Sequence, residues 1–108
     1  METVSFEEFK KLDVRVAVVK KVEPHPNADK LYVLTIDVGG QVKIIVAGIR
    51  NSYAPEGLEG KKIVVVNNLQ SAVIRGVESN GMLLAAKDDT VLALIVPDRD
   101  VASGSPIS

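Results

Sequence analysis

The segment LYVLTIDVGGQVKIIVA, residues 31–47, is the clearest indication of the fold class of this chain. Two runs rich in Val, Ile and Leu, residues 31–38 and 41–47, flank the pair Gly39-Gly40. Glycine tolerates the positive φ angles that tight two-residue turns demand, so the pattern predicts two strands joined as a β-hairpin.

Short apolar runs continue on both sides of this hairpin, separated by Gly, Pro and Asn, which is the spacing of a small all-β domain. Further strands are predicted over residues 13–22, 62–67, 81–86 and 91–96. Residues 70–78 are extended in character but carry no clear alternation. Asn80-Gly81 is predicted to form a hairpin turn, because both residues tolerate positive φ.

A short helix is predicted near the N-terminus. Ser5-Phe6-Glu7-Glu8 fits a capping box, in which the Ser5 hydroxyl caps the first turn and Glu8 reaches back. Phe6 and Phe9 then share one face of the helix. This helix either plugs one end of a barrel or contributes to a subunit contact.

Five strands with a helical turn between the third and the fourth match the order of an OB-fold, a five-stranded Greek-key barrel. The helical turn is expected after Asn51, in the connection over residues 48–61. A generic small sandwich or another Greek-key barrel stays open, since alternation alone does not separate these folds. We expect a single domain over residues 1–108, divided into an N-terminal helix (1–12), a barrel (13–86) and a C-terminal extension with an additional strand (87–108).

Length and composition limit the classes of protein to which the chain can belong. Its 108 residues suffice for one compact domain, and 46% apolar and 25% charged residues are ordinary for a globular protein. The absence of cysteine excludes disulfides and thiolate metal sites. No apolar run approaches the ~18 residues of a transmembrane helix, and no signal-peptide pattern opens the chain, so a cytoplasmic location without a membrane partner is expected.

Charge and aromatic content narrow the kind of nucleic acid that could bind. The net charge is −1, yet residues 1–87 hold twelve bases and ten acids, whereas residues 88–108 hold one base and four acids. A modest basic patch is therefore compatible with the sequence. The only aromatic residues are Phe6, Phe9, Tyr32 and Tyr53, too few to stack successive bases. Any nucleic acid partner is expected to be structured and gripped by its shape and phosphates.

Catalytic chemistry finds little support in the residues. His25 is the only histidine, lies between two prolines, and has no second imidazole or cysteine to complete a metal site. Gly39-Gly40 lacks the following Gly-Lys-Ser/Thr of a phosphate loop. Asp88-Asp89 is read as a solvated turn. We therefore expect no catalytic residue, no metal and no cofactor.

The candidate binding residues lie in two loops. OB-folds bind ligands around strands 2 and 3 and in the loops that join strands 1–2 and 4–5. Here these loops correspond to residues 23–30 and to the segment that ends in Glu-Ser-Asn-Gly. Their donors, suited to phosphate or ribose, are Asn27, Lys30, Ser79 and Asn80, and the third strand and its exit add the charges of Lys43 and Arg50.

The predicted sixth strand, residues 91–96, is apolar on both faces, so both faces must be covered. One face is expected to meet the barrel and the other a second subunit. The candidate dimer contacts are Phe6, Phe9, Leu92, Leu94 and Val96.

The two candidate loops also carry a family resemblance. The stretch ADKLY (28–32), which comes shortly after His-Pro, and the stretch VESNGMLLAA (77–86) resemble the tRNA-binding OB-fold family. FKKLDVRV (9–16) and PEGLEGKK (55–62) are similar to the family's entries into strands 1 and 4. This family includes the C-terminal appended domain of methionyl-tRNA synthetases, free-standing homodimeric tRNA-binding proteins and the C-terminal domain of synthetase-associated cofactors.

The resemblance implies a non-catalytic domain that binds tRNA by its L-shape and assists a methionyl-tRNA synthetase catalytic core in cis or in trans. It also implies a homodimer built partly from the N-terminal helix region and the strands beyond the barrel. In this family, the Lys after Ala-Asp and the Ser and Met of a Ser-x-Gly-Met motif belong to the tRNA face. Here they correspond to Lys30, Ser79 and Met82, and Asn80 occupies the variable position.

A secretion-related chaperone that shares this fold and dimer, and that binds polypeptide segments, is the alternative. Both the ADKLY loop and the Ser-x-Gly-Met motif are present in this chain, which favours tRNA.

Overall fold

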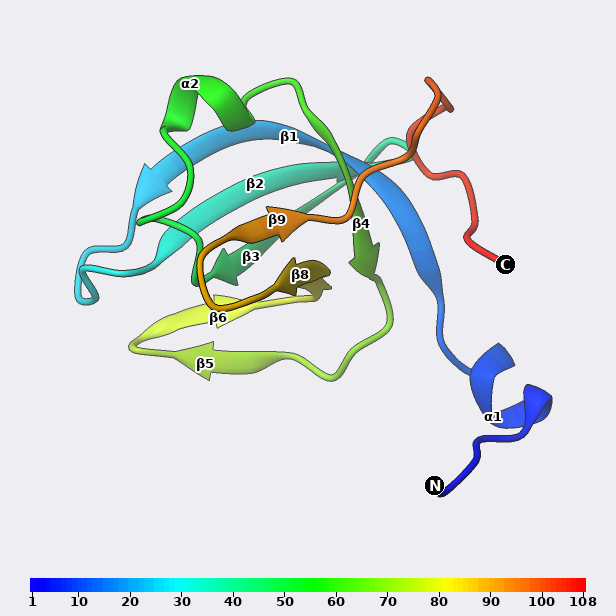
Figure 1. Cartoon of the computed structure of the whole chain (residues 1–108). Coiled ribbons are helices and arrows are strands. Elements are labelled where there is room, and N and C mark those ends of the chain that lie inside the picture. The colour runs from blue at the N-terminus through cyan, green and yellow to red at the C-terminus, as the bar shows by residue number, and fades with distance from the viewer.

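The predicted strands form one strongly curled antiparallel sheet in the order β3-β2-β1-β4-β7, a half-barrel seen in Figure 1. A computed structural model describes all residues from 1 to 108. The sheet comprises β1 (Val14–Pro24), β2 (Tyr32–Val38), β3 (Gln41–Ala47), β4 (Lys62–Val66) and β7 (Met82–Leu83). Strands β3, β2 and β1 are consecutive, and β4 returns beside β1, which is the Greek-key arrangement. The predicted all-β, OB-type fold is confirmed.

The curl of the sheet depends on β1, which is shared between two neighbours. Its first half, residues 14–18, pairs with β4, and its second half, residues 18–24, pairs with β2. The register shifts between Val19 and Lys21. Such a bulge bends a strand and increases its twist, which lets β1 serve both sides of the barrel.

The turn predicted at Asn80-Gly81 is wrong. The hairpin turn lies at Arg75-Gly76, between β5 (Ala72–Ile74) and β6 (Val77–Ser79), and both turn residues have positive φ (53° and 92°). Asn80-Gly81 instead links β6 to β7. A side chain on Gly81 would place its Cβ 3.1 Å from the Val66 carbonyl oxygen, so glycine is required here for close approach.

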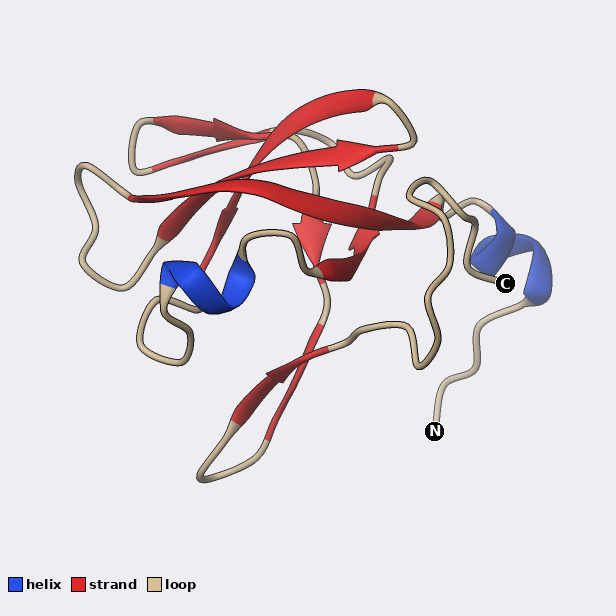
Figure 2. Cartoon of the chain, turned by 90° about the horizontal axis from the view of Figure 1, so that it is seen from above, coloured by secondary structure: helices blue, strands red, loops and turns tan.

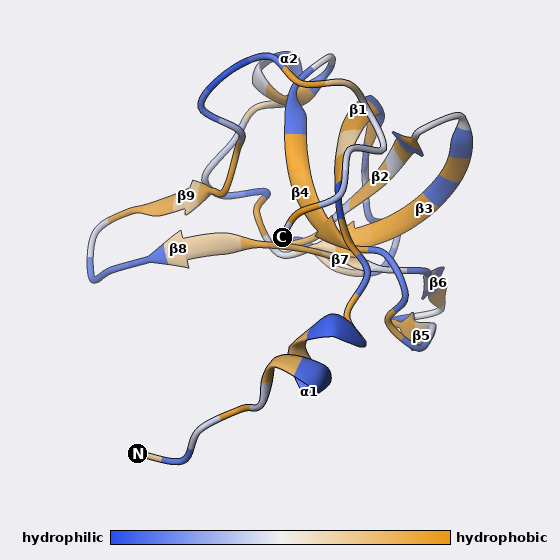
Figure 3. Cartoon of the chain, turned by 90° about the vertical axis from the view of Figure 1, so that its right-hand side faces the viewer, coloured by the Kyte–Doolittle hydropathy of each residue, from blue (hydrophilic) through white to orange (hydrophobic).

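The predicted fifth strand is divided at Leu84. Its first part is β7, whereas its second part, β8 (Ala85–Lys87), leaves the sheet and pairs with β9 (Leu92–Leu94), as Figure 3 shows. At the division, the Leu84 N–H donates to the Val64 carbonyl and the Leu84 carbonyl accepts from Ile95 N–H. The sixth strand is thus shorter than predicted and forms a separate two-stranded ribbon.

The two helices differ in what they bury. α1 (Phe6–Lys10) begins with the predicted capping box between Ser5 and Glu8, but it buries no residue and lies beyond the N-terminal end of β1 (Figures 1 and 2). The interpretation of this helix as a barrel plug is wrong. α2 (Pro55–Leu58) lies between β3 and β4 as predicted, starting at Pro55, and its Leu58 is fully buried in the core. Neither helix has the length and apolar character required to cross a membrane.

Strand β4 is apolar on both faces. Ile63 and Val65 point into the main core inside the curl. Val64 and Val66 form a second cluster with Val14 on the outer face. Part of this outer face is not covered by other segments of the chain.

Candidate nucleic-acid interface

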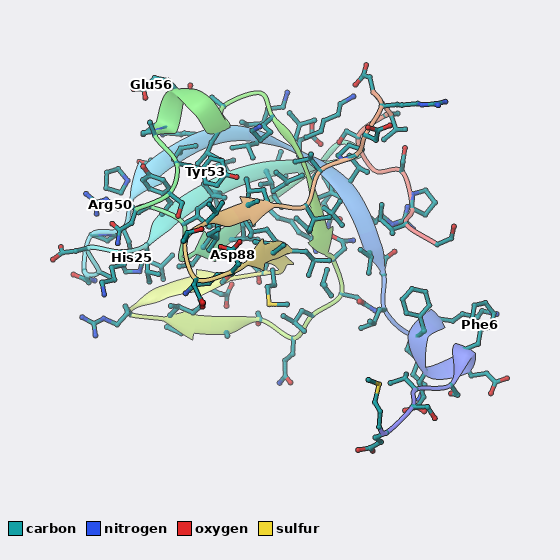
Figure 4. All side chains as sticks on the ribbon, in the orientation of Figure 1. Phe6, His25, Arg50, Tyr53, Glu56 and Asp88 are labelled. Atoms are coloured by element: carbon teal, nitrogen blue, oxygen red, sulfur yellow. The ribbon has the colours of Figure 1, made fainter.

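Four basic side chains gather at one end of the barrel, which we call the basic end. They are Lys30, Arg50, Arg75 and Lys87, from the β1–β2 loop, the exit of β3, the β5–β6 turn and the end of β8. Figure 1 shows these segments at the left-hand end, and Figure 4 places the labelled Arg50 there, opposite to Phe6. None of the four takes part in an ion pair, so their charges are free to meet an anion.

The β1–β2 loop is fastened to the β5–β6 hairpin through His25. This side chain is 4% exposed, its Nδ1 accepts from the Asn27 N–H at 2.9 Å, and its Nε2 lies 2.9 Å from the Ile74 carbonyl oxygen. Because Nδ1 accepts, Nε2 carries the hydrogen and donates to Ile74. The side-chain amide of Asn27 in turn donates to the Arg75 carbonyl at 3.2 Å. His25 is therefore a structural residue of the loop.

Lys30 and Lys87 border one open pocket of about 330 Å³, together with Asn51 and Ser52. The rim also carries Asp88, which lies in the predicted turn between β8 and β9. Hydrogen bonds from the backbone N–H groups of Thr90 and Val91, and from the Thr90 hydroxyl, lower the pKa of Asp88. The Asp88 carboxylate therefore already accepts hydrogen bonds from its own turn.

Ser79 and Asn80 join β6 to the outer edge of β3. The Ser79 hydroxyl accepts from the Val46 N–H at 2.9 Å and donates to the Gly81 carbonyl at 3.1 Å, and the residue is 4% exposed. The Asn80 N–H donates to the Ile44 carbonyl at 2.9 Å. The Ser79 hydroxyl is thus used inside the protein, and it closes the barrel between β3 and β6.

The structure places Lys43 away from the basic end. Residues alternate across a strand, and Lys43 shares its face of β3 with the buried Ile45. Its Nζ donates to the Asn67 carbonyl at 2.7 Å, near Asp13. Hydrogen bonds from Asn67 and Arg15, and then the nearby charges of Arg15 and Lys43, lower the pKa of Asp13. Lys43 belongs to this polar cluster rather than to the set around Lys30.

Met82 lines two surface pockets. One is a narrow cleft of about 210 Å³ between β3 and the β5–β6 hairpin, which also touches Val46, Ile74 and Ser79. The other, which we call the apolar groove, crosses the outer face of β4, where Figure 3 shows the apolar colouring of this strand. The groove measures about 650 Å³ and is lined by Phe9, Leu12, Val14, Val64, Val66, Leu69, Met82, Leu84, Ile95, Val96, Pro97 and Ile107.

The candidate dimer contacts divide between the groove and other places. Phe9 and Val96 line the apolar groove and are 43% and 45% exposed. Phe6 is 71% exposed and lies outside the groove. Leu94 is buried in the main core and Leu92 packs against it, so these two side chains face the barrel instead of the outside.

Comparison with known proteins identifies the family. Residues 14–106 match the family model described as "Putative tRNA binding domain". The chain belongs to this tRNA-binding domain family. The resemblance seen in its loops is thereby confirmed.

The relatives of this tRNA-binding domain include larger enzymes. The chain is 49% identical to methionine–tRNA ligase of Pyrococcus furiosus over 107 aligned residues. The alignment covers 99% of this chain and 15% of the ligase. The chain therefore spans about 15% of the length of these curated relatives. It corresponds to a segment of the ligase.

Two solved structures share the fold over the whole chain. A MetRS-related protein from Pyrococcus horikoshii superposes with a TM-score of 0.92 and 38% identity, covering 100% of both chains. The chaperone CsaA from Bacillus anthracis superposes with a TM-score of 0.89 and 30% identity, covering 99% of this chain and 100% of the chaperone.

The sequence reasoning did not identify two basic residues of this tRNA-binding domain. Residues 70–78 show no alternation, so the sequence does not predict the hairpin that carries Arg75. The Arg-Gly pair is recognisable as its turn only once the hairpin is known. Lys87 ends an apolar run immediately before Asp88, and only the fold shows that it borders the same pocket as Lys30. Both are exposed at the basic end.

Proposed function

We propose that this tRNA-binding domain holds tRNA by its folded shape, with the basic end against the phosphate backbone. The observation that carries the proposal is the gathering of Lys30, Arg50, Arg75 and Lys87, none of which has an acidic partner. Cations that neutralise phosphates release condensed counterions, which supplies affinity without reading bases. The scarcity of aromatic side chains fits a partner recognised by shape.

The geometry suggests separate tasks for the polar residues. Lys30 and Arg50 neutralise phosphates, and the side chains of Asn27 and Asn80 hydrogen-bond backbone oxygens or 2′-hydroxyls. Ser79 acts indirectly, since its hydroxyl holds β3 against β6.

Two further members of the predicted set lie away from the basic end. The Met82 thioether packs against a ribose or base face at the end of the narrow cleft that leads along β3. Lys43 supports the fold through its bond to the Asn67 carbonyl.

The function of such a domain is capture. In the cytoplasm it raises the concentration of tRNA near a methionyl-tRNA synthetase catalytic core, to which it is linked in cis or in trans. The similarity of this chain to a segment of methionine–tRNA ligase supports this assignment. A tether of this kind adds ~10²–10⁴ in avidity without new contacts. The core supplies catalysis and the anticodon specificity.

We further infer that a second copy of the chain covers the apolar groove, giving a homodimer. The outer face of β4 already buries Val64 and Val66, and an open apolar surface beside them gains free energy when it is covered. The alternative function is capture of polypeptide segments in the same groove, which the similarity to a chaperone favours.

A gel shift with tRNA over a range of salt concentrations, with an unfolded polypeptide as competitor, tests the proposal. Affinity should fall by about 0.7–0.9 log unit per log unit of salt for each phosphate contact. Lys30→Ala should weaken different tRNAs about equally, and a loss confined to one tRNA would indicate base readout. A flat salt response overturns the phosphate contacts. Tight binding of polypeptide without binding of tRNA establishes the chaperone alternative.

A further inference from the structure

The β1–β2 loop and the tip of the β5–β6 hairpin behave as one unit, although about fifty residues separate them in the sequence. Three hydrogen bonds cross between them: from His25 to the Ile74 carbonyl, from the Asn27 amide to the Arg75 carbonyl, and from the Arg75 guanidinium to the Asn27 carbonyl at 3.1 Å. The last two bonds form a reciprocal pair. The loop and the hairpin tip therefore hold each other in place.

We propose that Arg75 is a further phosphate-contacting residue of the tRNA interface and that His25 is its positioning residue. The inference rests on the proposed function and deepens it, because it names a contact outside the predicted set and the group that holds it.

Arg75 has the charge and the free donors that a phosphate contact requires. Its guanidinium offers five N–H donors, one of its nitrogens binds the Asn27 carbonyl, and no carboxylate pairs with it. The residue is exposed. A guanidinium that is held from one side and open on the other matches the bidentate geometry of a phosphate.

The backbone conformation at Arg75 also supports a functional role for its side chain. Its φ of 53° is the only positive φ among the non-glycine residues, and Asn or Gly would adopt it with less strain. Backbone positions of this kind cluster at functional sites, which adds support to a functional use of the Arg75 side chain. Arg75 lies in the turn at the hairpin tip, and Figure 1 shows this tip on the same side of the barrel as the β1–β2 loop.

His25 controls where the hairpin tip lies. Both ring nitrogens are used, Nδ1 within the loop and Nε2 on the hairpin, and the ring is buried between them. Pro24 and Pro26 restrict the backbone on either side. Without the imidazole, the hairpin loses its buried attachment to the loop and Arg75 must be ordered by the ligand, which weakens binding.

A double-mutant cycle on the full chain tests both parts. Arg75→Ala should weaken tRNA binding about 5–8-fold at 0.1 M salt and reduce the salt slope by about 0.7–0.9, as the loss of one phosphate contact requires. His25→Ala should weaken binding to a similar extent. In the His25→Ala background, Arg75→Ala should cost less than about 2-fold, because the side chain is already displaced. Arg99→Ala, an exposed arginine outside the basic end, is the matched control and should change binding little.

Each outcome decides a separate point. An unchanged affinity and salt slope in Arg75→Ala, while Lys30→Ala still weakens binding, overturns the Arg75 contact and leaves the proposed function intact. Additive losses in the cycle overturn the positioning role of His25. Absence of tRNA binding by the unaltered chain overturns the proposed function itself.

Two further variants apply if His25→Ala unfolds. His25→Gln keeps a donor for the Ile74 carbonyl and should recover part of the affinity. Asn27→Ala removes the exposed half of the attachment without touching the core, and Arg75→Ala should again cost less in this background than in the unaltered chain. Additivity in both variants again overturns the positioning role.

Discussion

The basic end and the apolar groove lie on the same small barrel, but they leave opposite kinds of side chain unpartnered. At the basic end, Lys30, Arg75 and Lys87 are exposed without ion pairs. In the groove, Phe9, Val96 and Met82 are partly exposed beside the buried Val64.

Charges act at a distance and are screened by salt, whereas apolar surface acts only on contact and is not screened. The two faces therefore suit different partners, and changing the salt concentration separates their contributions to binding. Variants that change one face at a time should break the two activities apart.

The largest effect is expected from removing three charges of the basic end together. Lys30→Ala, Arg50→Ala and Arg75→Ala combined should weaken tRNA binding at 0.1 M salt by more than about 10²-fold and lower the salt slope by about 2–3. Titrations at three salt concentrations measure both quantities.

The matched control removes three basic residues elsewhere, Lys10, Lys11 and Arg99, and changes the net charge equally. Equal losses in the two triple variants would show that overall charge, and not the basic end, drives binding.

A charge placed in the apolar groove should act on self-association instead. Val96→Asp puts a carboxylate in a surface that a second copy is proposed to cover, and a buried unpaired charge costs at least about 2 kcal/mol, or about 30-fold in the dissociation constant. Sedimentation velocity over a range of protein concentrations measures the change.

Val101→Asp is the control, since Val101 is 39% exposed and lies outside the groove. Dimerisation that survives Val96→Asp, or that is lost equally in the control, would place the interface elsewhere.

Ser79→Ala should reveal that this residue acts through the barrel. The change leaves the Val46 N–H and the Gly81 carbonyl without their partner, at a cost of roughly 1–3 kcal/mol. A fall in the melting temperature of several degrees is expected, measured by circular dichroism. Ser52→Ala, in which the lost hydroxyl is exposed and makes no hydrogen bond, should melt like the unaltered chain. A Ser79→Ala variant with normal melting and weakened tRNA binding would instead assign Ser79 a direct contact.

The smallest effect is expected in the pH dependence of the melting temperature. The pKa of Asp13 is lower in the folded chain than in the unfolded chain, so its ionised form stabilises the fold above about pH 4, and this contribution is lost as the pH falls through the folded pKa. Asp13→Asn should therefore melt earlier than the unaltered chain at pH 7, and the difference should shrink below about pH 4.

Asn67→Ala, which removes the largest cause of the lowered pKa, should reduce the same pH dependence. A melting difference that is equal at both pH values would contradict this account.

Local pattern was sufficient for much of the fold. Gly39-Gly40 between two apolar runs specified the β2–β3 hairpin, and Ser5 with Glu8 specified the start of α1. These features depend on residues a few positions apart. The same reasoning failed at Asn80-Gly81, because the pair that turns the chain is Arg75-Gly76 and the close packing of Gly81 against Val66 involves distant strands.

The candidate site was predictable in its residues more than in its arrangement. Asn27, Lys30 and Arg50 were selected from their loops, and the structure brings these segments to one end of the barrel. Lys43 was selected on its charge, but the alternation of β3 turns it toward Asn67. The apolar pattern on both faces of its segment predicts Leu92 at a subunit contact, and only packing shows that it faces the core.

The family, the strand pattern and the identity of the loops can be predicted from the residues alone, because turn preferences, alternation and short motifs are local properties. Which side chains remain free depends on how the segments pack against one another. This packing closes Ser79 into the joint between β3 and β6, fastens Arg75 to Asn27, and leaves one stretch of the outer face of β4 open. These outcomes depend on contacts between segments that are far apart in the sequence, whose geometry no local pattern specifies.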